Sequence, residues 1–425
     1  MSRRVVVTGL GVVSSIGSTM DQFTASLRAG TSGAEVHPAM VEHRFGCHVA
    51  AVPSGIDELA ERYFDEELLL AMNSGHRMAS IASVDAWTDA GLERPASGDD
   101  AVNWDTGAII GTGVGGLDTT GGKIVPLTDA CKVRRIGSTG VEQVMASGVS
   151  ARVSGILALG NQVTTNSSAC STGTEAVIMG LDRIRAGRAE RMLCGGVEGE
   201  SHYSWAGFDA MRVLSRTFND RPQEASRPMS GSAAGFVPGA GAGVLMLESL
   251  DSALERGARI HAEVLGGDLN CGGHRMGGSM TAPNPTSVQR CIRGALADAG
   301  IGPESVDAVS GHLTATGADA REVRSWAAAL ECSPGDLPAI TSTKSLIGHT
   351  LGAAGAIETI AAIAMIEGGF VHPSINCEDV HPEIEPFKDS IPHQIRELPE
   401  LKTIIKSGFG FGDVNACLVL ARHQG

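Results

Sequence analysis

Short apolar runs rich in β-branched residues recur along the chain, and glycines bound most of them. The clearest runs are 4–9, 106–111, 191–196, 243–249, 261–267 and 414–422. They lack the strict alternation of apolar and polar residues that is typical of a strand with one solvated face. We therefore predict strands that are covered by other elements on both faces.

Helical patterns lie between these runs. In the segment 287–300, Val288, Ile292 and Leu296 recur at the spacing of one helix face. Strands that alternate with helices are typical of a layered α/β fold.

A weak internal repeat adds to this picture. The segments 173–187 and 355–369 have the same length and end in glycine, and a turn rich in small residues precedes each of them. The second segment is apolar nearly all round, which predicts a helix buried in the centre of the molecule. Two similar halves, each sending a helix to the middle, would place reactive loops where the halves meet. The alternative is that two apolar helices resemble each other by chance.

Composition and charge narrow the class of protein. The 425 residues carry a net charge of −15 without a compensating basic block, which argues against nucleic-acid binding as the main activity. Nine scattered cysteines without a CxxC pair argue against a disulfide framework or a structural zinc site, so we expect a reducing, cytoplasmic environment. The start, MSRRVVVTGLGVV, resembles a first strand more than a signal peptide, and we expect no membrane span because no run of about 18 uninterrupted apolar residues is present.

The first candidate for chemistry is Cys170, in the stretch 161-NQVTTNSSACSTGTEAVIMG-180. It lies where a polar segment gives way to a helical pattern. Backbone N–H groups and the positive end of the helix dipole at such a position favour a thiolate. By itself, an ordinary buried thiol is the commoner interpretation.

Two further stretches supply imidazoles and a buried charge. The segment 310-SGHLTATGADARE-322 places His312 in a loop of small and hydroxyl residues. The segment 341-TSTKSLIGHTLGAAGAIE-358 holds Lys344 and His349 in nearly uncharged surroundings. A buried ammonium group needs a partner, and Glu358 is the first carboxylate downstream.

The fourth stretch is 407-SGFGFGDVNA-416, where glycines surround Phe409 and Phe411. Glycines at these positions allow close approach of the backbone and suit a turn that points an N–H group into a site.

These four stretches, in this order, resemble the β-ketoacyl-(acyl carrier protein) synthases of the elongating type, which act in fatty acid and type II polyketide synthesis. The segment 342-STKSLIGHTLGAAG-355 matches the Lys/His motif of that family almost residue for residue, and 408-GFGFGDVNA-416 resembles its closing motif. Weaker similarity extends over nearly the whole chain.

The resemblance implies a thiolase-like α/β fold, a five-layer α-β-α-β-α sandwich of two duplicated halves. Residues 1–250 would form the half that carries the nucleophile, and residues 251–425 the half that carries the His/Lys/His loops. The family is usually a homodimer, and a heterodimer with a homologous chain is the alternative.

The resemblance also implies roles for the reacting residues. Cys170 would accept an acyl chain from a thioester, and His312 and His349 would stabilise the enolate formed when malonyl on the acyl carrier protein loses CO2. The N–H groups of Cys170 and Phe411 would form an oxyanion hole, and Phe411 would also gate the acyl pocket.

Supporting roles follow from the same resemblance. Lys344, held by Glu358, would keep the charge and the hydrogen bonds of the site in order. Thr314 and Thr316 would bind the phosphopantetheine arm of the carrier protein. No metal or redox cofactor is implied.

The chain departs from the family pattern at several places. Leu313 stands where the family has a glycine, Gly317 where it has a proline, and Ala240 where it has a glutamate. The segment 70–80, where many members carry a basic cluster for carrier docking, has only Arg77 clearly positive. The remaining basic candidates for docking are Lys123, Lys132, Arg134, Arg135 and Arg212.

Three other functions fit single features of the chain. The stretch 111-GTGVGG-116 fits a dinucleotide-binding motif with Asp129 near the acidic position, but the residues after it make a poor helix start. A degradative thiolase needs a second cysteine in a glycine-rich loop, whereas Cys417 lies in an apolar run that predicts a core strand. An inactive chain-length factor would lack the nucleophile, and this chain keeps Cys170.

Overall fold

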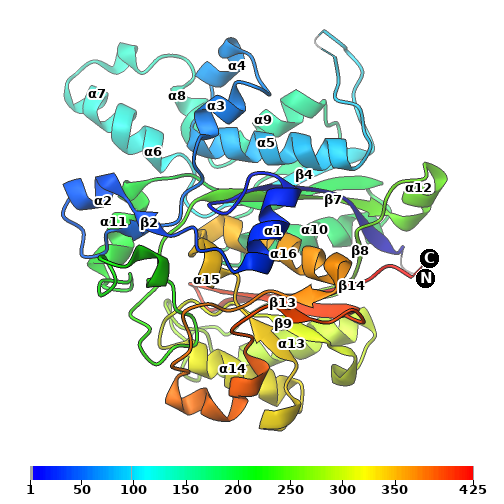
Figure 1. Cartoon of the computed structure of the whole chain (residues 1–425). Coiled ribbons are helices and arrows are strands. Elements are labelled where there is room, and N and C mark those ends of the chain that lie inside the picture. Colours follow the sequence, from blue (N-terminus) through cyan, green and yellow to red (C-terminus); the bar gives the residue numbers. More distant parts are fainter. Residues whose placement is uncertain (1–2, 97, 425) are drawn as a thin grey trace.

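The computed structural model describes residues 3–96 and 98–424. Ten strands pair into one continuous sheet, which consists of two five-stranded halves (Figure 1). The first half contains β1 (Val5–Val13), β4 (Thr106–Thr112), β5 (Val163–Thr164), β6 (Arg191–Glu198) and β7 (Gly241–Ser249). The second half contains β8 (Ala262–Cys271), β9 (Ala308–Ser310), β10 (Ala339–Thr341), β13 (Thr403–Gly410) and β14 (Val414–Ala421).

The two halves have the same topology. Their strand orders are β5-β4-β6-β7-β1 and β10-β9-β13-β14-β8, so each order uses the third, second, fourth, fifth and first strand of its half. In both halves the second strand is parallel to its two neighbours, and the remaining pairs are antiparallel. The halves join where Val5–Val7 of β1 lies opposite Ala262–Val264 of β8. The predicted duplication is confirmed, while the boundary between residues 250 and 251 stays a prediction.

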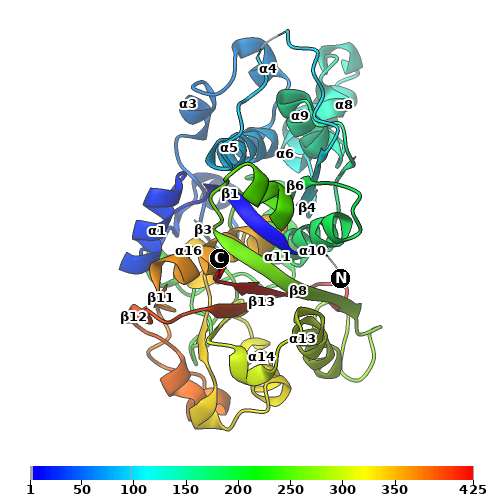
Figure 2. The same cartoon turned by 90° about the vertical axis from the view of Figure 1, so that its right-hand side faces the viewer.

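Helices complete five layers (Figures 1 and 2). The outer layers are α5 (Ser74–Asp89) with α9 (Gly148–Leu157) on the first half, and α13 (Pro285–Ala299) with α14 (Asp319–Ala329) on the second. The central layer holds α10 (Thr172–Arg185) and α16 (Ala354–Gly368), which contact each other and strands of both halves. The predicted five-layer sandwich is therefore confirmed.

Helix α16 explains the apolar pattern that the sequence shows on all of its faces. Every residue from Ala354 to Ile366 is buried. Although polar residues interrupt its apolar run, the segment Leu351–Gly368 is long and apolar enough to cross a membrane, but 89% of it is buried inside the protein. This segment is the central core helix of the fold.

Shorter elements decorate the layers and connect them. The helices are α1 (Met20–Ala29), α2 (Pro38–Glu42), α3 (Ile56–Ala60), α4 (Glu66–Leu70), α6 (Leu117–Thr119), α7 (Val125–Asp129), α8 (Gly140–Val144), α11 (His202–Ala210), α12 (Leu250–Glu255) and α15 (Lys344–Ile347). The short strands are β2 (Glu35–Val36), β3 (Val49–Ala50), β11 (Phe370–Val371) and β12 (Arg396–Glu397). Residues 117–145, from α6 through α8, project from the outer layer of the first half and are called the 117–145 lobe below (Figure 1).

Candidate active site

Cys170 lies at a tight elbow directly before α10. Ala169 has a φ of 51°, and the Thr172 hydroxyl ties the elbow together by donating to the Ala169 carbonyl at 2.7 Å. The sulfur is deep in the protein, and only part of the residue is accessible, toward a pocket. Burial raises the pKa of the Cys170 thiol to about 11, although the Lys344 charge and the Phe411 N–H oppose this. Desolvation of the anion outweighs these two favourable contributions, so the helix start by itself does not give a thiolate in the resting site.

His349 lies beside this thiol. Its Nε2 atom is 3.1 Å from Cys170 Sγ, and the backbone N–H of Leu351 donates to its Nδ1 atom at 3.2 Å. Because Nδ1 accepts a hydrogen bond, the neutral ring carries its proton on Nε2. Burial, and then the Lys344 and Lys406 charges, hold the pKa of His349 well below its usual range. His349 thus presents a neutral N–H donor to the sulfur.

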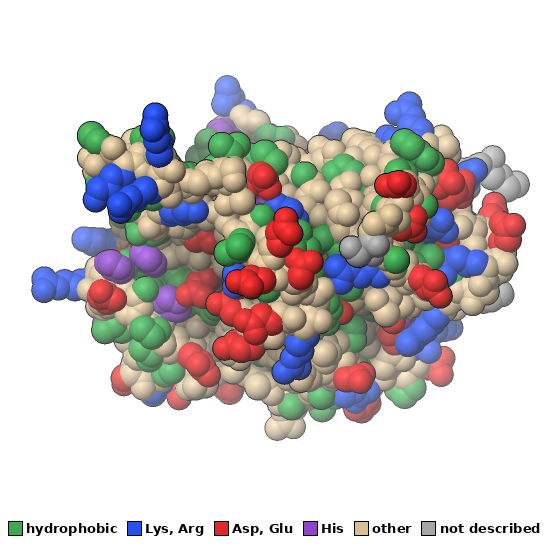
Figure 3. All heavy atoms as spheres, turned by 90° about the horizontal axis from the view of Figure 1, so that it is seen from above, with side chains coloured by type: hydrophobic (Ala, Val, Ile, Leu, Met, Phe, Trp, Pro, Cys, Tyr) green, Lys and Arg blue, Asp and Glu red, His purple; other side chains and the backbone are tan. Residues whose placement is uncertain are grey.

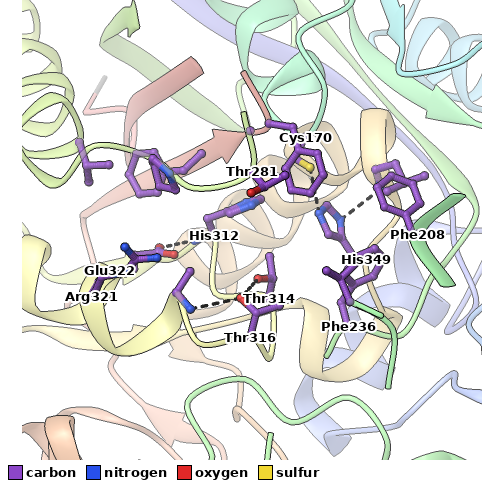
Figure 4. Close-up of a pocket in the computed structure, with 18 of the residues that line it drawn as sticks. Cys170, Phe208, Phe236, Thr281, His312, Thr314, Thr316, Arg321, Glu322 and His349 are labelled. Carbon is purple, nitrogen blue, oxygen red and sulfur yellow. Dashed lines mark hydrogen bonds between the residues drawn. The ribbon is translucent and has the colours of Figure 1, made fainter. Parts of the chain in front are cut away.

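His312 reaches the same point from the opposite loop, and Figure 4 shows both rings directed toward Cys170. The two imidazoles contact each other edge to face, with 5.5 Å between ring centroids. Lys344 Nζ lies 3.3 Å from His312 Nδ1, and an ammonium group can only donate. His312 therefore also carries its proton on Nε2, and burial together with nearby positive charge holds its pKa well below the usual range.

The ammonium group of Lys344 is fixed by a buried carboxylate. Lys344 forms an ion pair with Glu358 and donates to the His312 carbonyl at 2.6 Å. Both side chains are almost completely inaccessible to solvent. The partner that the sequence suggested for Lys344 is thus the one that the fold supplies.

The loop that carries His312 is anchored by two carboxylates that were not among the predicted site residues. Glu322 accepts from the N–H groups of His312 at 2.6 Å and Leu313 at 2.8 Å, and burial raises its pKa to about 7. Asp319 accepts from the N–H groups of Thr314 and Met229, both at 2.9 Å. The sequence signal for these two carboxylates is their position in the first turn of the helix that follows the hydroxyl-rich loop.

Leu313 replaces the expected glycine at a cost in backbone geometry. Its φ is 24°, in a region that disfavours side chains with a Cβ atom, and its side chain is fully buried in the outer core of the second half. The packing of this side chain and the anchoring of its N–H by Glu322 hold the loop in this conformation.

The glycine-rich end of β13 approaches Cys170 as predicted. A Cβ atom at Gly410 would lie 3.1 Å from the Cys170 nitrogen and 2.9 Å from the Ser168 carbonyl oxygen. This contact leaves room only for glycine. The backbone N–H of Phe411, the next residue, acts on the Cys170 sulfur and opposes the rise of its pKa. The predicted pair of backbone donors, from Cys170 and Phe411, therefore lies at one place.

A cavity of about 340 Å³ opens onto the sulfur (Figure 4). Its lining is mainly apolar and includes Phe208, Phe236 and Phe411. The hydroxyl groups of Thr314 and Thr316 face the same cavity and lie 3.0 Å apart. A mostly apolar cavity with a few polar groups at the reactive atom suits an acyl chain.

The site could hold a metal by distance alone, since one ligand atom from each of Cys170, His312 and His349 lies within 4.8 Å of the others. The hydrogen bonds oppose this use. Both Nδ1 atoms accept, so both Nε2 atoms are protonated and offer no lone pair. The arrangement suits donation of hydrogen bonds better than coordination of a metal.

The two features that suggested other functions, the 111–116 glycine motif and Cys417, have structural roles. The N–H groups of Gly113 and Val114, which a dinucleotide phosphate would need, donate to the buried Glu198 carboxylate at 2.9 and 3.2 Å. Cys417 is buried in β14 and does not line the cavity, so it is the core residue that its apolar surroundings predicted.

Comparison with known proteins identifies the family. Residues 2–253 match the family description "Beta-ketoacyl synthase, N-terminal domain", and residues 261–378 match "Beta-ketoacyl synthase, C-terminal domain". The chain belongs to the β-ketoacyl synthase family. It is accordingly a condensing enzyme of the acyltransferase class, as its resemblance predicted.

Among the relatives, 3-oxoacyl-[acyl-carrier-protein] synthase 1 of Haemophilus influenzae is 34% identical over 427 residues, covering 100% of both chains. The Escherichia coli K12 synthase 1 is 32% identical over 420 residues, covering 99% of both. Among solved structures, "The ishigamide ketosynthase/chain length factor" has a TM-score of 0.89 at 33% identity over the whole of both chains. A type II polyketide carrier protein in complex with its ketosynthase, AntDE:AntF, has a TM-score of 0.88 at 29% identity, also over the whole of both chains.

Proposed function

We propose that this β-ketoacyl synthase condenses an acyl group held on Cys170 with malonyl-(acyl carrier protein), releasing CO2 and giving 3-oxoacyl-(acyl carrier protein). The observation that carries the proposal is the convergence of one thiol and two Nε2–H donors at the end of an apolar cavity. Its pathway is fatty acid synthesis or the synthesis of a specialised lipid or polyketide.

The first half-reaction is a thioester exchange. Cys170 sulfur attacks the acyl carbonyl, the carrier thiolate leaves, and the proton of the Cys170 thiol ends on the carrier sulfur. The N–H groups of Cys170 and Phe411 stabilise the tetrahedral oxyanion. Because burial raises the pKa of the thiol, its proton is lost as the sulfur attacks, and the His349 N–H stabilises the charge that develops on sulfur.

The second half-reaction uses the imidazoles as donors. The malonyl thioester carbonyl accepts from Nε2–H of His312 and His349, and the bond to the carboxylate breaks with loss of CO2. The resulting enolate carbon attacks the acyl carbonyl on Cys170, and collapse of the tetrahedral intermediate expels the Cys170 thiolate, which then takes up a proton. Neutral imidazoles suit this role because they donate without needing deprotonation.

Binding of the carrier arm falls to the threonine hydroxyls. Thr314 and Thr316 line the cavity that opens onto Cys170, on the side of His312. Asp319 anchors the backbone of their loop, and the two hydroxyls contact each other. We propose that the chain's own residues suffice, without a metal or redox cofactor, and that the reaction takes place in the cytoplasm.

The carrier protein is a partner that must be recognised by a local basic surface, since both proteins are acidic overall. Figure 3 shows basic side chains gathered at the end of the face formed by the 117–145 lobe, and acidic side chains toward its middle. The basic residues of the lobe are Lys123, Lys132, Arg134 and Arg135. A fifth candidate, Arg212, is exposed between the cavity-lining residues Met211 and Val213.

A second synthase-like chain is the other proposed partner. The 117–145 lobe exposes Val125, Val133 and Val141, which are between 47% and 70% accessible and suit burial against a protein surface. Within the described residues, strand β5 pairs only with β4 and forms one edge of the sheet, where another chain could add. A homodimer is the simpler assembly. An active subunit paired with a chain-length-factor-like chain is the alternative, and the similar ishigamide structure is a ketosynthase/chain length factor.

The activity is tested by offering malonyl-carrier protein with a panel of acyl-carrier proteins, while acyl-enzyme mass and CO2 release are followed. The proposal predicts an acylated Cys170 peptide. It also predicts that CO2 and the 3-oxoacyl product form in equal amounts. Native mass spectrometry of the enzyme from its own source distinguishes the homodimer from the heterodimer. Acylation at a different residue would contradict the proposed mechanism.

A further inference from the structure

Behind the two histidines lies a second buried lysine that the proposed mechanism does not use. Lys406 belongs to β13, and its side chain is completely inaccessible to solvent. Its Nζ atom is 3.1 Å from Glu358 Oε2 and donates to the Thr174 hydroxyl at 2.5 Å. Thr174 lies in the first turn of α10, which follows Cys170 directly.

Glu358 therefore has a lysine on each oxygen, Lys344 on Oε1 and Lys406 on Oε2. One ammonium group would already neutralise this carboxylate. Burial of a second one disfavours its charged form and lowers the pKa of Lys406, so pairing of charge alone does not explain its presence.

The location of Lys406 indicates what it adds. It connects three elements: strand β13, which leads to Phe411, helix α16 through Glu358, and helix α10 through Thr174. Glu358 in turn orients Lys344, and Lys344 fixes the tautomer of His312.

We propose that Lys406 is a positioning residue that holds Glu358 and Lys344 in register with Cys170 and keeps both active-site imidazoles neutral. This inference rests on the proposed roles of His312 and His349 as neutral donors. It adds a buried charge to the Lys344–Glu358 pair that the family resemblance implies.

The charges around the imidazoles decide whether loss of Lys406 raises or lowers the imidazole pKa values. The titratable groups near His312 are Lys344, His349, Lys406 and Cys170, with Glu322 on its backbone N–H. Those near His349 are Lys344, Lys406, His312 and Cys170. Both lysine charges lower the imidazole pKa values. Loss of the Lys406 charge must therefore raise these pKa values, so that the imidazoles protonate at higher pH and lose their activity as neutral donors earlier on acidification.

The test is the pH dependence of CO2 release from malonyl-carrier protein by the full-length enzyme. For Lys406→Met we expect the acid limb of kcat to move to higher pH by about one unit, the size expected for loss of one nearby charge in the protein interior. The pH dependence of Cys170 alkylation by iodoacetamide should also move to higher pH, because Glu358 then has only one compensating lysine. Where Lys406→Met does not fold, Lys406→Gln removes the charge and keeps a donor for Glu358 and Thr174.

Two controls separate positioning from stability. Ile404→Ala shortens a buried side chain on the same strand and should lower stability without moving the pH profile. Lys402→Met removes an exposed lysine charge just before this strand and should change neither the stability nor the pH profile. The double variant Lys406→Met/Glu358→Gln removes one buried charge of each sign, so its acid limb should lie closer to that of the wild type than the limb of Lys406→Met does.

An acid limb that stays in place in a folded Lys406→Met enzyme would overturn the inference, and would leave the proposed condensation intact. Failure of the wild-type enzyme to release CO2 would instead count against the proposed function. The two failures are therefore distinguishable.

Discussion

The backbone N–H of Leu351 donates to Nδ1 of His349 at 3.2 Å, and this hydrogen bond decides which ring nitrogen faces Cys170 with a proton. Leu351 precedes the central helix α16, so the tautomer of a reactive imidazole is set by the path of the backbone into the core. The lysine beside His312 does the same for the second ring. Both rings are thereby prepared as donors.

His349→Gln tests this donor role. A glutamine amide can place an N–H near the position of Nε2, whereas alanine cannot. We expect His349→Ala to lower CO2 release about 100-fold or more, in the range for loss of one oxyanion donor, and His349→Gln to lower it less. Acylation of Cys170 should fall less than CO2 release in both variants. Equal losses in the two variants would argue against donation from Nε2.

Lys344→Met tests the buried ion pair. Removing one partner leaves Glu358 with Lys406 alone and takes the donor away from His312 Nδ1. We expect the free energy of unfolding to fall by about 1–3 kcal/mol, because the His312 carbonyl and Nδ1 lose a buried donor while Lys406 still compensates Glu358. CO2 release should fall more than acylation. Chemical denaturation and the two half-reaction assays measure these changes. A variant as stable as the wild type would show that the pair does not hold the centre of the fold.

His372 predicts a pH dependence of stability that is independent of catalysis. It is fully buried, its Nε2 accepts from the Thr343 hydroxyl at 3.0 Å, and its Nδ1 donates to the Pro373 carbonyl at 2.9 Å. Burial lowers its pKa from an ordinary 6.5 to about 4. A histidine with a lowered pKa in the folded state stabilises fully above 6.5, and this contribution is lost as the pH falls toward 4.

The corresponding variant is His372→Gln. Between pH 6.5 and 4 the wild type should lose about 1.4 kcal/mol of unfolding free energy per pH unit through this residue. The variant should lose correspondingly less over the same range. Denaturant titrations at several pH values measure both slopes, and identical slopes would show that His372 does not stay neutral in the folded protein.

How far the sequence predicted this structure can be judged from particular elements. The helices that begin at Thr172 and Ala354 were predicted within a residue or two, because their apolar patterns are long. Strands β9 and β10 were missed, since three residues carry no period, and β13 was missed because Lys406 and its glycines interrupt the apolar run.

For the site, too, residues in local motifs were predicted, and residues that act through long-range contacts were not. The nucleophile, both histidines and the Lys344–Glu358 pair were predicted, since each lies in a distinctive local motif. Lys406, Glu322 and Glu198 were not, because their roles arise from contacts between elements far apart in the chain. The high pKa of Cys170 was also missed, since burial of a side chain depends on all the layers around it.

Asp413 offers a test of the loop that borders the cavity. This buried residue has a φ of 61°, and its carboxylate accepts from the N–H groups of His274 at 3.0 Å and Asn284 at 2.8 Å. Asp413→Gly removes both acceptors in a backbone conformation that glycine adopts readily. We expect a loosened loop between these two contacts and alkylation of Cys170 several-fold faster than in wild type. Asp413→Asn keeps one acceptor, so its alkylation rate should lie between those of the wild type and the glycine variant. An unchanged alkylation rate in the glycine variant would contradict the prediction.

The convergence of one sulfur and two imidazole donors is tested most directly by mass spectrometry of the enzyme after exposure to acyl-carrier protein, alongside Cys170→Ala. The wild type should gain one acyl group, located on the Cys170 peptide, and should lose it when malonyl-carrier protein is added and CO2 is released. Cys170→Ala should gain none. Uptake of an acyl group by Cys170→Ala would show that the nucleophile lies elsewhere and that the proposed mechanism is wrong.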